Sequence, residues 1–347
     1  MPPGYERTYI MPDTSVPAPS LAHKRKIDLK PYGPAIALLL LCITGFSLNS
    51  AFLSEGNITN LLTRSAFIGI IAIGATFVIT AGGIDLSVGS MAAAIAGVMI
   101  ILMNNLVDTL GTGSLTVVVG AICAILLGLG AGFANGFLTT KGKIEAFIVT
   151  LGTMGISRSL VTYFADGGTL SLNFEIRNTY RPVYYESVLW VPIPVWVFIG
   201  VSITGWFLMN RTTFGRYCTA IGSNENVAQY SAINVNRIKT WTYMIQGVCV
   251  ALATVIYVPR LGSASSSTGV LWELEAIAAV IIGGTVLKGG YGRIGGTILG
   301  ALILTTIGNI LNFTDLISNY LNGTMQGLII IIAVWLQRVD WGARPKV

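Results

Sequence analysis

Three residues, Asp85, Ser87 and Gly89, interrupt an apolar stretch and could line a path through a membrane. Residues 71–90 read IAIGATFVITAGGIDLSVGS, so an apolar run reaches two glycines and a lone acid before apolar sequence resumes. Backbone that leaves the helix at membrane depth is tolerated only beside protein or a water-filled cavity, and an ionisable side chain there suggests function. Broken helices mark many transport pathways. We therefore predict a translocation path or gating turn at these three residues.

The same stretch allows a simpler interpretation. Two glycines can form a tight turn between two helices, and Asp85 can cap the second helix by accepting backbone N–H bonds. The two interpretations are compatible, because a capped turn can also shape a path.

A second candidate site is the loop over residues 211–239, which reads RTTFGRYCTAIGSNENVAQYSAINVNRIK. Ser223 or Asn224 can cap a short helix over residues 225–230, which would stop near residues 231–234. Such a helix, held by the spans on either side, can transmit the movement of a partner protein to those spans. An interfacial loop helix without a partner explains the same spacing equally well.

The residues that catalysis or metal binding requires are not clustered in this chain. Its only histidine is His23, and its four cysteines show no paired spacing, so a metal site or a disulfide framework has no basis. Gly142 and Lys143 are followed by Ile144 in place of the Ser or Thr of a phosphate-binding loop. We therefore expect no catalytic residue, no metal and no bound cofactor. We also expect no nucleic-acid partner, because membrane topology accounts for the basic residues behind the net charge of +6.

A transporter driven by an ion gradient, moving a small polar solute, is the main alternative. It would need titratable groups within the membrane, and the candidates are Asp85, Glu145, Arg158, Glu273 and Glu275. All except Arg158 fall near predicted span ends, which favours structural or gating roles over a proton relay. Arg158 can pair with an acid or with backbone carbonyls.

The composition places both candidate sites in an integral membrane protein. Of 347 residues, 53% are hydrophobic and only 10% are charged, whereas soluble domains carry about 25% charged residues. A spanning helix needs about 20 apolar residues, and such segments follow one another with short polar gaps. We predict a single all-α domain whose ten spans lie near residues 34–53, 64–81, 88–107, 114–138, 144–164, 189–209, 239–258, 273–288, 294–313 and 319–337.

Basic residues orient these spans. With the N-terminus inside, 16 of the 21 Lys and Arg residues fall in the tails and the cytoplasmic loops, as the positive-inside rule requires. Residues 1–32 are then a flexible cytoplasmic tail, residues 33–338 the membrane domain, and residues 339–347 a second cytoplasmic tail. The loop over residues 211–239 is cytoplasmic, and the loop over residues 166–190 is periplasmic.

Two further features concern loops. The predicted periplasmic loop over residues 166–190 mixes charges with tyrosines, which suits a protein-docking surface, although an ordinary solvated loop has a similar composition.

Residues 73–90 and 282–296 resemble each other weakly. Each contains glycines and is followed by a helix rich in small residues. If this is an internal repeat, residues 288–295 form a second tight turn that faces the cytoplasm.

Four motifs make a family resemblance specific. They are GGIDLSVGS, IEAFIVTLGTMGISRSL, AIGSNENVAQYSAINVNRIK and EAIAAVIIGGTVLKGGYGRIGGTILGALIL, in this order. Together they resemble the permease subunits of bacterial carbohydrate-uptake ABC transporters, of the ribose, galactose and autoinducer-2 type. The likeness covers about residues 35–338.

The chain departs from the usual pattern of this family at three positions. Relatives often have proline where this chain has Glu145, and glycine where it has Ser159 and Ala232. The resemblance does not identify the sugar.

The resemblance implies a ten-helix inner-membrane subunit of vitamin-B12-permease-like (type II importer) architecture, paired with a second copy or a related permease. It would pass a sugar received from a periplasmic binding protein, while two cytoplasmic ATPase subunits bind ATP and Mg²⁺. The family's signature turn matches Asp85, Ser87 and Gly89. Its coupling helix, which would contact the ATPase, matches Gly222, Ser223, Asn224, Glu225 and Asn226.

Overall fold

The computed structural model describes residues 32–314, 324, 327–328 and 331. Met1–Gly33 is a unit separate from Pro34–Val347, and only residues 32 and 33 of this first unit are described. The predicted tails over residues 1–32 and 339–347 therefore lie outside the described residues, apart from residue 32. Most of the predicted span over residues 319–337 lies outside them too.

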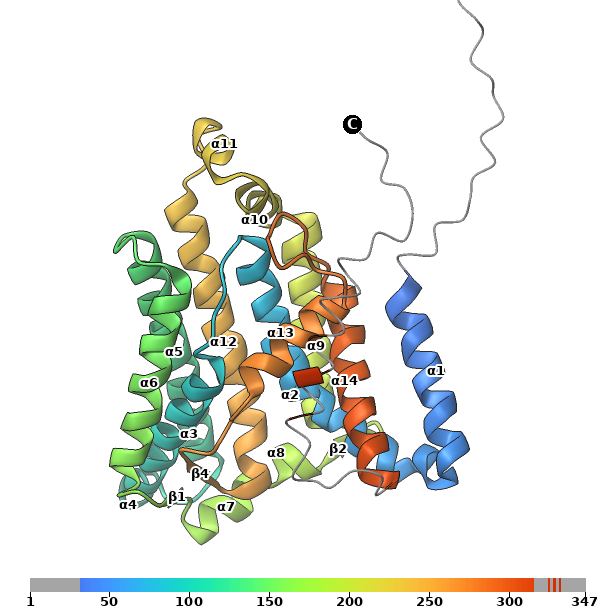
Figure 1. The fold of residues 1–347 in the computed structure, drawn as a ribbon. Coiled ribbons are helices and arrows are strands. Elements are labelled where there is room, and N and C mark those ends of the chain that lie inside the picture. Colours follow the sequence, from blue (N-terminus) through green and yellow to red (C-terminus); the bar gives the residue numbers. More distant parts are fainter. Residues whose placement is uncertain (1–31, 315–323, 325–326, 329–330, 332–347) are drawn as a thin grey trace, which may run out of the picture. The chain divides into compact units, whose positions relative to one another are not determined.

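Helices make up most of the described chain (Figure 1). The helices are α1 (Gly33–Leu48), η2 (Ser50–Leu53), α2 (Glu55–Thr80), α3 (Val88–Asn105), α4 (Val107–Leu110), α5 (Ser114–Thr140), α6 (Ala146–Phe164), α7 (Phe174–Tyr180), α8 (Pro182–Tyr185), α9 (Ile193–Arg211), α10 (Thr213–Ser223), α11 (Glu225–Tyr230), α12 (Val235–Leu261), α13 (Trp272–Ile282) and α14 (Ile294–Thr314). The strands are β1 (Thr169–Ser171), β2 (Ser187–Val188), β3 (Val191–Pro192) and β4 (Ser263–Ser265).

Seven helices of the described part are long and apolar enough to cross a membrane, namely α2, α3, α5, α6, α9, α12 and α14. Helix α1 is apolar but has only 16 residues. The predicted span over residues 273–288 is wrong, because α13 has 11 residues and ends at Ile282. At 1.5 Å per residue it is about 16 Å long, roughly half of the hydrocarbon thickness. Non-helical chain with positive φ at Gly284, Gly289 and Gly290 follows it.

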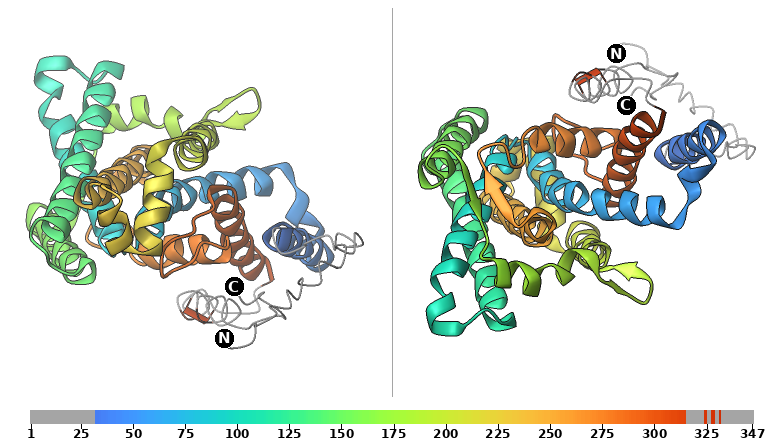
Figure 2. Two further views of the ribbon diagram at one scale, coloured as in Figure 1. Left: turned by 90° about the horizontal axis from the view of Figure 1, so that it is seen from above. Right: turned by 90° about the horizontal axis from the view of Figure 1, so that it is seen from below.

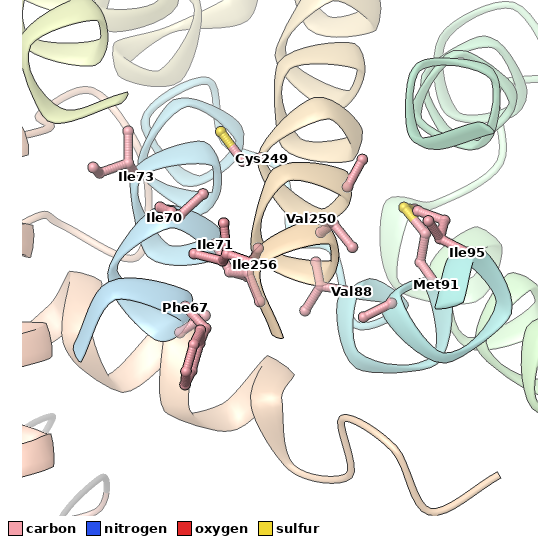
Figure 3. Packing of buried hydrophobic residues seen from close by; sticks show 14 of the residues in the cluster. Phe67, Ile70, Ile71, Ile73, Val88, Met91, Ile95, Cys249, Val250 and Ile256 are labelled. Carbon is pink, nitrogen blue, oxygen red and sulfur yellow. The ribbon is translucent and has the colours of Figure 1, made fainter. Parts of the chain in front are cut away.

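Helix α2 forms the centre of the membrane domain and packs against α9, α12, α13 and α14. Figure 2 looks down on this arrangement from both ends. Close packing of isoleucines from α2 with residues of α3 and α12 makes up much of the core (Figure 3). Lipid is as apolar as these side chains, so the hydrophobic effect does not drive the helices together within a membrane. Dispersion contacts and close approach of the backbones hold them together instead. An example of close approach is Gly128 of α5, where an added Cβ would meet the carbonyl oxygen of Gly247 in α12.

The loop over residues 166–190 is folded onto the helices. Strand β1 pairs with β4 in antiparallel register, with Leu170 opposite Ala264. Tyr180 is fully buried and its hydroxyl donates to the carbonyl of Val255 at 2.6 Å. This tyrosine therefore holds the loop to α12, and it is not available to the docking surface that the composition suggested. The β2–β3 hairpin instead exposes Leu189 and Trp190, both with positive φ.

The predicted orientation can be tested with single cysteines at opposite ends of the domain. Helices α7 and α11 lie at opposite ends (Figure 1), and Phe174 and Tyr230 are 74% and 89% exposed there. We expect a membrane-impermeant maleimide to label Phe174→Cys in right-side-out vesicles and Tyr230→Cys only in inside-out vesicles. Cys218 should stay unlabelled, because it is buried and burial raises the pKa of its thiol to about 12. The reverse labelling pattern would contradict the orientation.

Candidate functional site

The predicted break between two membrane helices is present. Helix α2 ends at Thr80, Gly82 has φ +80°, and helical geometry resumes at Val88. In Figure 1 the chain descends from the upper end of α2 to the start of α3 without forming a helix. A left-handed φ favours glycine because it carries no Cβ. The extended segment places Asp85 and Ser87 inside the protein, where Asp85 is only 6% exposed.

Asp85, Ser87 and Asn135 form a chain of buried hydrogen bonds. The Asp85 Oδ1 atom accepts from the Ser87 backbone nitrogen at 2.9 Å and from the Ser87 hydroxyl at 2.6 Å. The Asn135 Nδ2 atom of α5 donates to that hydroxyl at 2.9 Å. Asp85 thus accepts a backbone N–H from the residue before α3 and not from the first turn of this helix, so the predicted capping of the helix by Asp85 is wrong. The N-cap position itself is Ser87, whose side chain makes no cap bond.

Two acceptor atoms of this cluster remain unused. Asp85 Oδ2 and Asn135 Oδ1 are buried without a hydrogen-bond partner among the described residues. Buried acceptors are costly when they are left unpaired. Hydroxyl groups of a solute or of water can supply the missing donors, which is the chemistry expected of a path for a polar solute.

Gly89 faces a different neighbour from Asp85 and Ser87. A Cβ at Gly89 would collide with the carbonyl oxygen of Gly269 and lie 2.6 Å from Glu273 Oε2. The segment that contains Gly269 is held from the other side by Arg158 of α6, which donates to the carbonyls of Ser266, at 2.5 Å, and of Thr268. Arg158 therefore uses backbone carbonyls, one of the two pairings expected for it.

The loop over residues 211–239 contains the short helix that was predicted. Asn224 Oδ1 accepts from the Val227 backbone nitrogen at 3.1 Å and caps α11, whereas the Ser223 hydroxyl bonds back to Thr219. Glu225 is paired within the chain, because Lys239 Nζ donates to its Oε2 atom at 2.6 Å. At the end of the helix Ala232 has φ +60°, a left-handed conformation that costs a non-glycine residue roughly 1 kcal/mol or more.

Two exposed apolar residues of α11 were missed by sequence reasoning. Val227 and Tyr230 are both solvent-exposed, and their i, i+3 spacing puts them on one face of the helix. This spacing is visible in the sequence, but six residues are too few for a reliable helical pattern. Val227 and Tyr230 thus add two exposed apolar side chains directly after the predicted coupling residues.

The end of α10 touches both interrupted turns through backbone atoms. A Cβ at Gly222 would collide with the Thr80 carbonyl oxygen and with the Gly290 backbone nitrogen, and these two atoms already share a 2.9 Å hydrogen bond. Gly289 lies against Gly82 as well as Gly222. We call Thr80, Gly82, Gly222, Gly289 and Gly290 the glycine junction. The two turns that resembled each other in sequence thus meet here, directly before α11.

The predicted site residues are therefore divided between two places. Asp85, Ser87 and Gly89 lie within the membrane domain, and residues 222–226 lie at its end, joined through the glycine junction to the turn that precedes Asp85. Within the described residues no group of His, Cys, Asp and Glu could hold a metal ion. The structure thus places a buried polar cluster and a short loop helix on either side of the glycine junction.

Comparison with known proteins identifies the family. Residues 57–334 match the model described as "Branched-chain amino acid transport system / permease component". The ribose import permease proteins RbsC of Haemophilus influenzae and Bacillus subtilis are 39% and 40% identical to this chain, over 86% and 88% of it and 90% and 92% of their own lengths. The D-allose transport system permease protein AlsC of Escherichia coli is 35% identical over 88% of this chain and 90% of its own length. No solved structure matches.

A family model that covers well over half of the chain, together with relatives this similar over most of both lengths, settles the assignment. The apolar helices agree with it. The chain belongs to this family of permease components and is a multi-pass inner-membrane permease related to those of sugar ABC importers.

Proposed function

We propose that this chain is the membrane-spanning subunit of an ATP-driven importer that passes a sugar or sugar-like solute into the cytoplasm. The observation that carries the proposal is the glycine junction, where the end of α10 packs by backbone contacts against both interrupted turns. Movement of α10 and α11 would reach these turns without passing through flexible side chains. The names of the relatives, which include permeases for ribose, D-allose and xylose, support a sugar as the solute.

The proposed assembly follows from this role. Two copies of the chain, or one copy and a related permease, would form the pore in a ten-helix, type II importer architecture with both termini in the cytoplasm. A periplasmic binding protein would deliver the sugar. Separate ATPase subunits would bind ATP and Mg²⁺, so the chain itself would be non-catalytic. Their contact would be residues 222–226, extended by the exposed side chains of Val227 and Tyr230.

Reconstitution tests the proposal. The chain is expressed with the ATPase and binding-protein genes that neighbour its own, purified in mild detergent and placed in liposomes. We expect a stable complex whose ATP hydrolysis rises with one sugar-loaded binding protein. A chain that purified alone and moved solute in response to an ion gradient would instead be a secondary transporter, and the proposed importer would be wrong.

Substitution of Glu225 tests the coupling contact. Glu225→Arg removes the pair with Lys239 and presents an opposite charge to a partner. Because the Glu225 side chain is 44% exposed, the pair itself contributes at most about 1 kcal/mol, so the unfolding midpoint should hardly change. We expect ATP hydrolysis to continue while sugar uptake per ATP falls. These quantities are measured together in proteoliposomes.

The double variant Glu225→Lys with Lys239→Glu separates the two roles of the carboxylate. It restores the ion pair with reversed polarity but leaves a cation on α11. Uptake that stays uncoupled indicates contact between Glu225 and the ATPase. Full recovery of coupling would mean that the carboxylate serves the internal pair alone.

A further inference from the structure

A cavity of about 440 Å³ is lined by α11 and by the turn after α2. Its walls come from the turn after α2, the end of α5, the linker to α6, and helices α11 and α12. The volume is within the roughly 300–1,000 Å³ of small-molecule sites. The cavity shares Glu225 with the proposed ATPase contact, whereas its other polar lining residues have no role in that contact.

The charges around the cavity cancel. Two lysines and two glutamates line the cavity, namely Lys143, Lys239, Glu145 and Glu225, and Lys239 is paired with Glu225 at 2.6 Å. A site that bound an anion would carry an excess of cationic groups, and a cation site would carry an excess of carboxylates. The balance of two positive and two negative groups favours a neutral polar ligand.

The remaining polar groups offer both donors and acceptors. The side-chain amides of Gln229 and Asn236 each carry an acceptor oxygen and two N–H donors, and hydroxyls of Thr139 and Thr242 line the same cavity. A sugar hydroxyl is also both a donor and an acceptor, so several neighbouring hydroxyls can be satisfied together. An apolar ligand would leave these groups unpaired, at a cost in free energy.

The floor of the cavity is the interrupted turn itself. Gly82 and Gly83 line it, and the Tyr243 hydroxyl beside them donates to the Ile84 carbonyl at 3.3 Å. A ligand in the cavity would therefore touch α11, α12 and the turn at the same time. Its presence would oppose movement of α11 relative to the turn.

We propose that this cavity binds a neutral, polyhydroxylated solute of monosaccharide size from the side on which α11 lies. The inference rests on the proposed function, because it takes the imported sugar as the natural ligand. Sugar that accumulates on the cytoplasmic side would occupy the cavity and slow further transport cycles.

Binding to the purified full-length chain, without ATPase or binding protein, tests the proposal. D-ribose, D-allose and D-xylose are titrated into the chain in nanodiscs, and binding is followed by saturation-transfer NMR. D-gluconate, which is a polyhydroxylated anion, and glycine betaine, which is a zwitterion without hydroxyl groups, serve as comparators. We expect saturable binding of at least one sugar and of neither comparator. Failure of all three sugars to bind saturably, or binding of gluconate in their place, would overturn the proposal.

Matched variants locate the bound sugar. Asn236→Leu and Gln229→Leu alter exposed residues and should each weaken binding about fivefold, the usual effect of losing one hydrogen bond. Asn178→Leu is the control, because Asn178 is an exposed residue of α7, at the opposite end of the domain (Figure 1). Equal unfolding midpoints confirm that the variants fold. Sugar binding that neither cavity variant weakens would place the ligand elsewhere and refute the site.

Uptake by the complete importer separates this proposal from the proposed function. Normal ATP-driven uptake by a permease that binds no sugar alone would refute the cavity site and leave the importer intact. Sugar binding sensitive to Asn236→Leu, without any ATP-driven uptake, would keep the cavity site and refute the importer.

Discussion

Alanine at Gly222 is expected to abolish sugar uptake by the reconstituted importer while the chain still inserts into the membrane. The added Cβ would collide with the Thr80 carbonyl oxygen and the Gly290 backbone nitrogen, and backbone atoms cannot rotate away as a side chain can. In a helix, alanine is ordinarily better than glycine by about 1 kcal/mol. Any loss must therefore come from overpacking, which costs about 1–3 kcal/mol and would push α10 away from the two turns.

The measurement is sugar uptake in proteoliposomes together with the unfolding midpoint in detergent. Gly130→Ala is the matched control, because a Cβ at Gly130 in α5 meets no atom within 4 Å and uptake should be unchanged. Gly222→Val should be at least as damaging as Gly222→Ala. Normal uptake by Gly222→Ala would show that the glycine junction does not transmit movement.

Alanine at Asp85 is expected to lower both the thermal stability and the uptake of the permease. The Ser87 backbone N–H and hydroxyl would lose their common acceptor, and each buried polar group left unpaired costs about 1–3 kcal/mol. The loss would also release the Ser87 hydroxyl from its position between Asp85 and Asn135. We expect a markedly lower unfolding midpoint in detergent and strongly reduced uptake.

Asp85→Asn separates the hydrogen bonds from the charge. Asparagine keeps one side-chain oxygen in the place of Oδ1, so both bonds from Ser87 can form and the midpoint should fall less than for Asp85→Ala. If uptake by Asp85→Asn is nonetheless lost, the carboxylate acts in the path beyond its structural bonds. Wild-type stability and uptake in Asp85→Ala would refute both the structural role of Asp85 in the turn and its gating role.

Local features of both sites could be predicted from the sequence. The break at the glycine pair Gly82 and Gly83, the return to helix near Val88 and the short helix α11 capped by Asn224 are all observed. Each depends on residues within a few positions of one another, where capping groups and left-handed glycines act directly on the backbone. Their physics is local, so a single stretch of sequence carries it.

The predicted span over residues 273–288 fails for an instructive reason. Hydropathy reports that a segment is buried in an apolar environment, and it does not report the backbone conformation. Helix α13 ends at Ile282, and the glycines that follow adopt positive φ. The Thr80 carbonyl accepts from the Gly290 backbone nitrogen. Protein thus meets a backbone hydrogen-bonding need that lipid could not meet.

Composition and local motifs therefore determined the membrane class, most of the long helices and the two candidate stretches, residues 71–90 and 211–239. Only the tertiary structure decided that these stretches touch. Thr80, Gly222 and Gly290 are far apart along the chain, yet their backbones meet. A glycine in a sequence permits a close approach without naming the partner, because the missing side chain carries no information about what lies against it. The same holds for the pairing of Glu225 with Lys239, where many opposite charges were available and packing of α11 on α12 selected one.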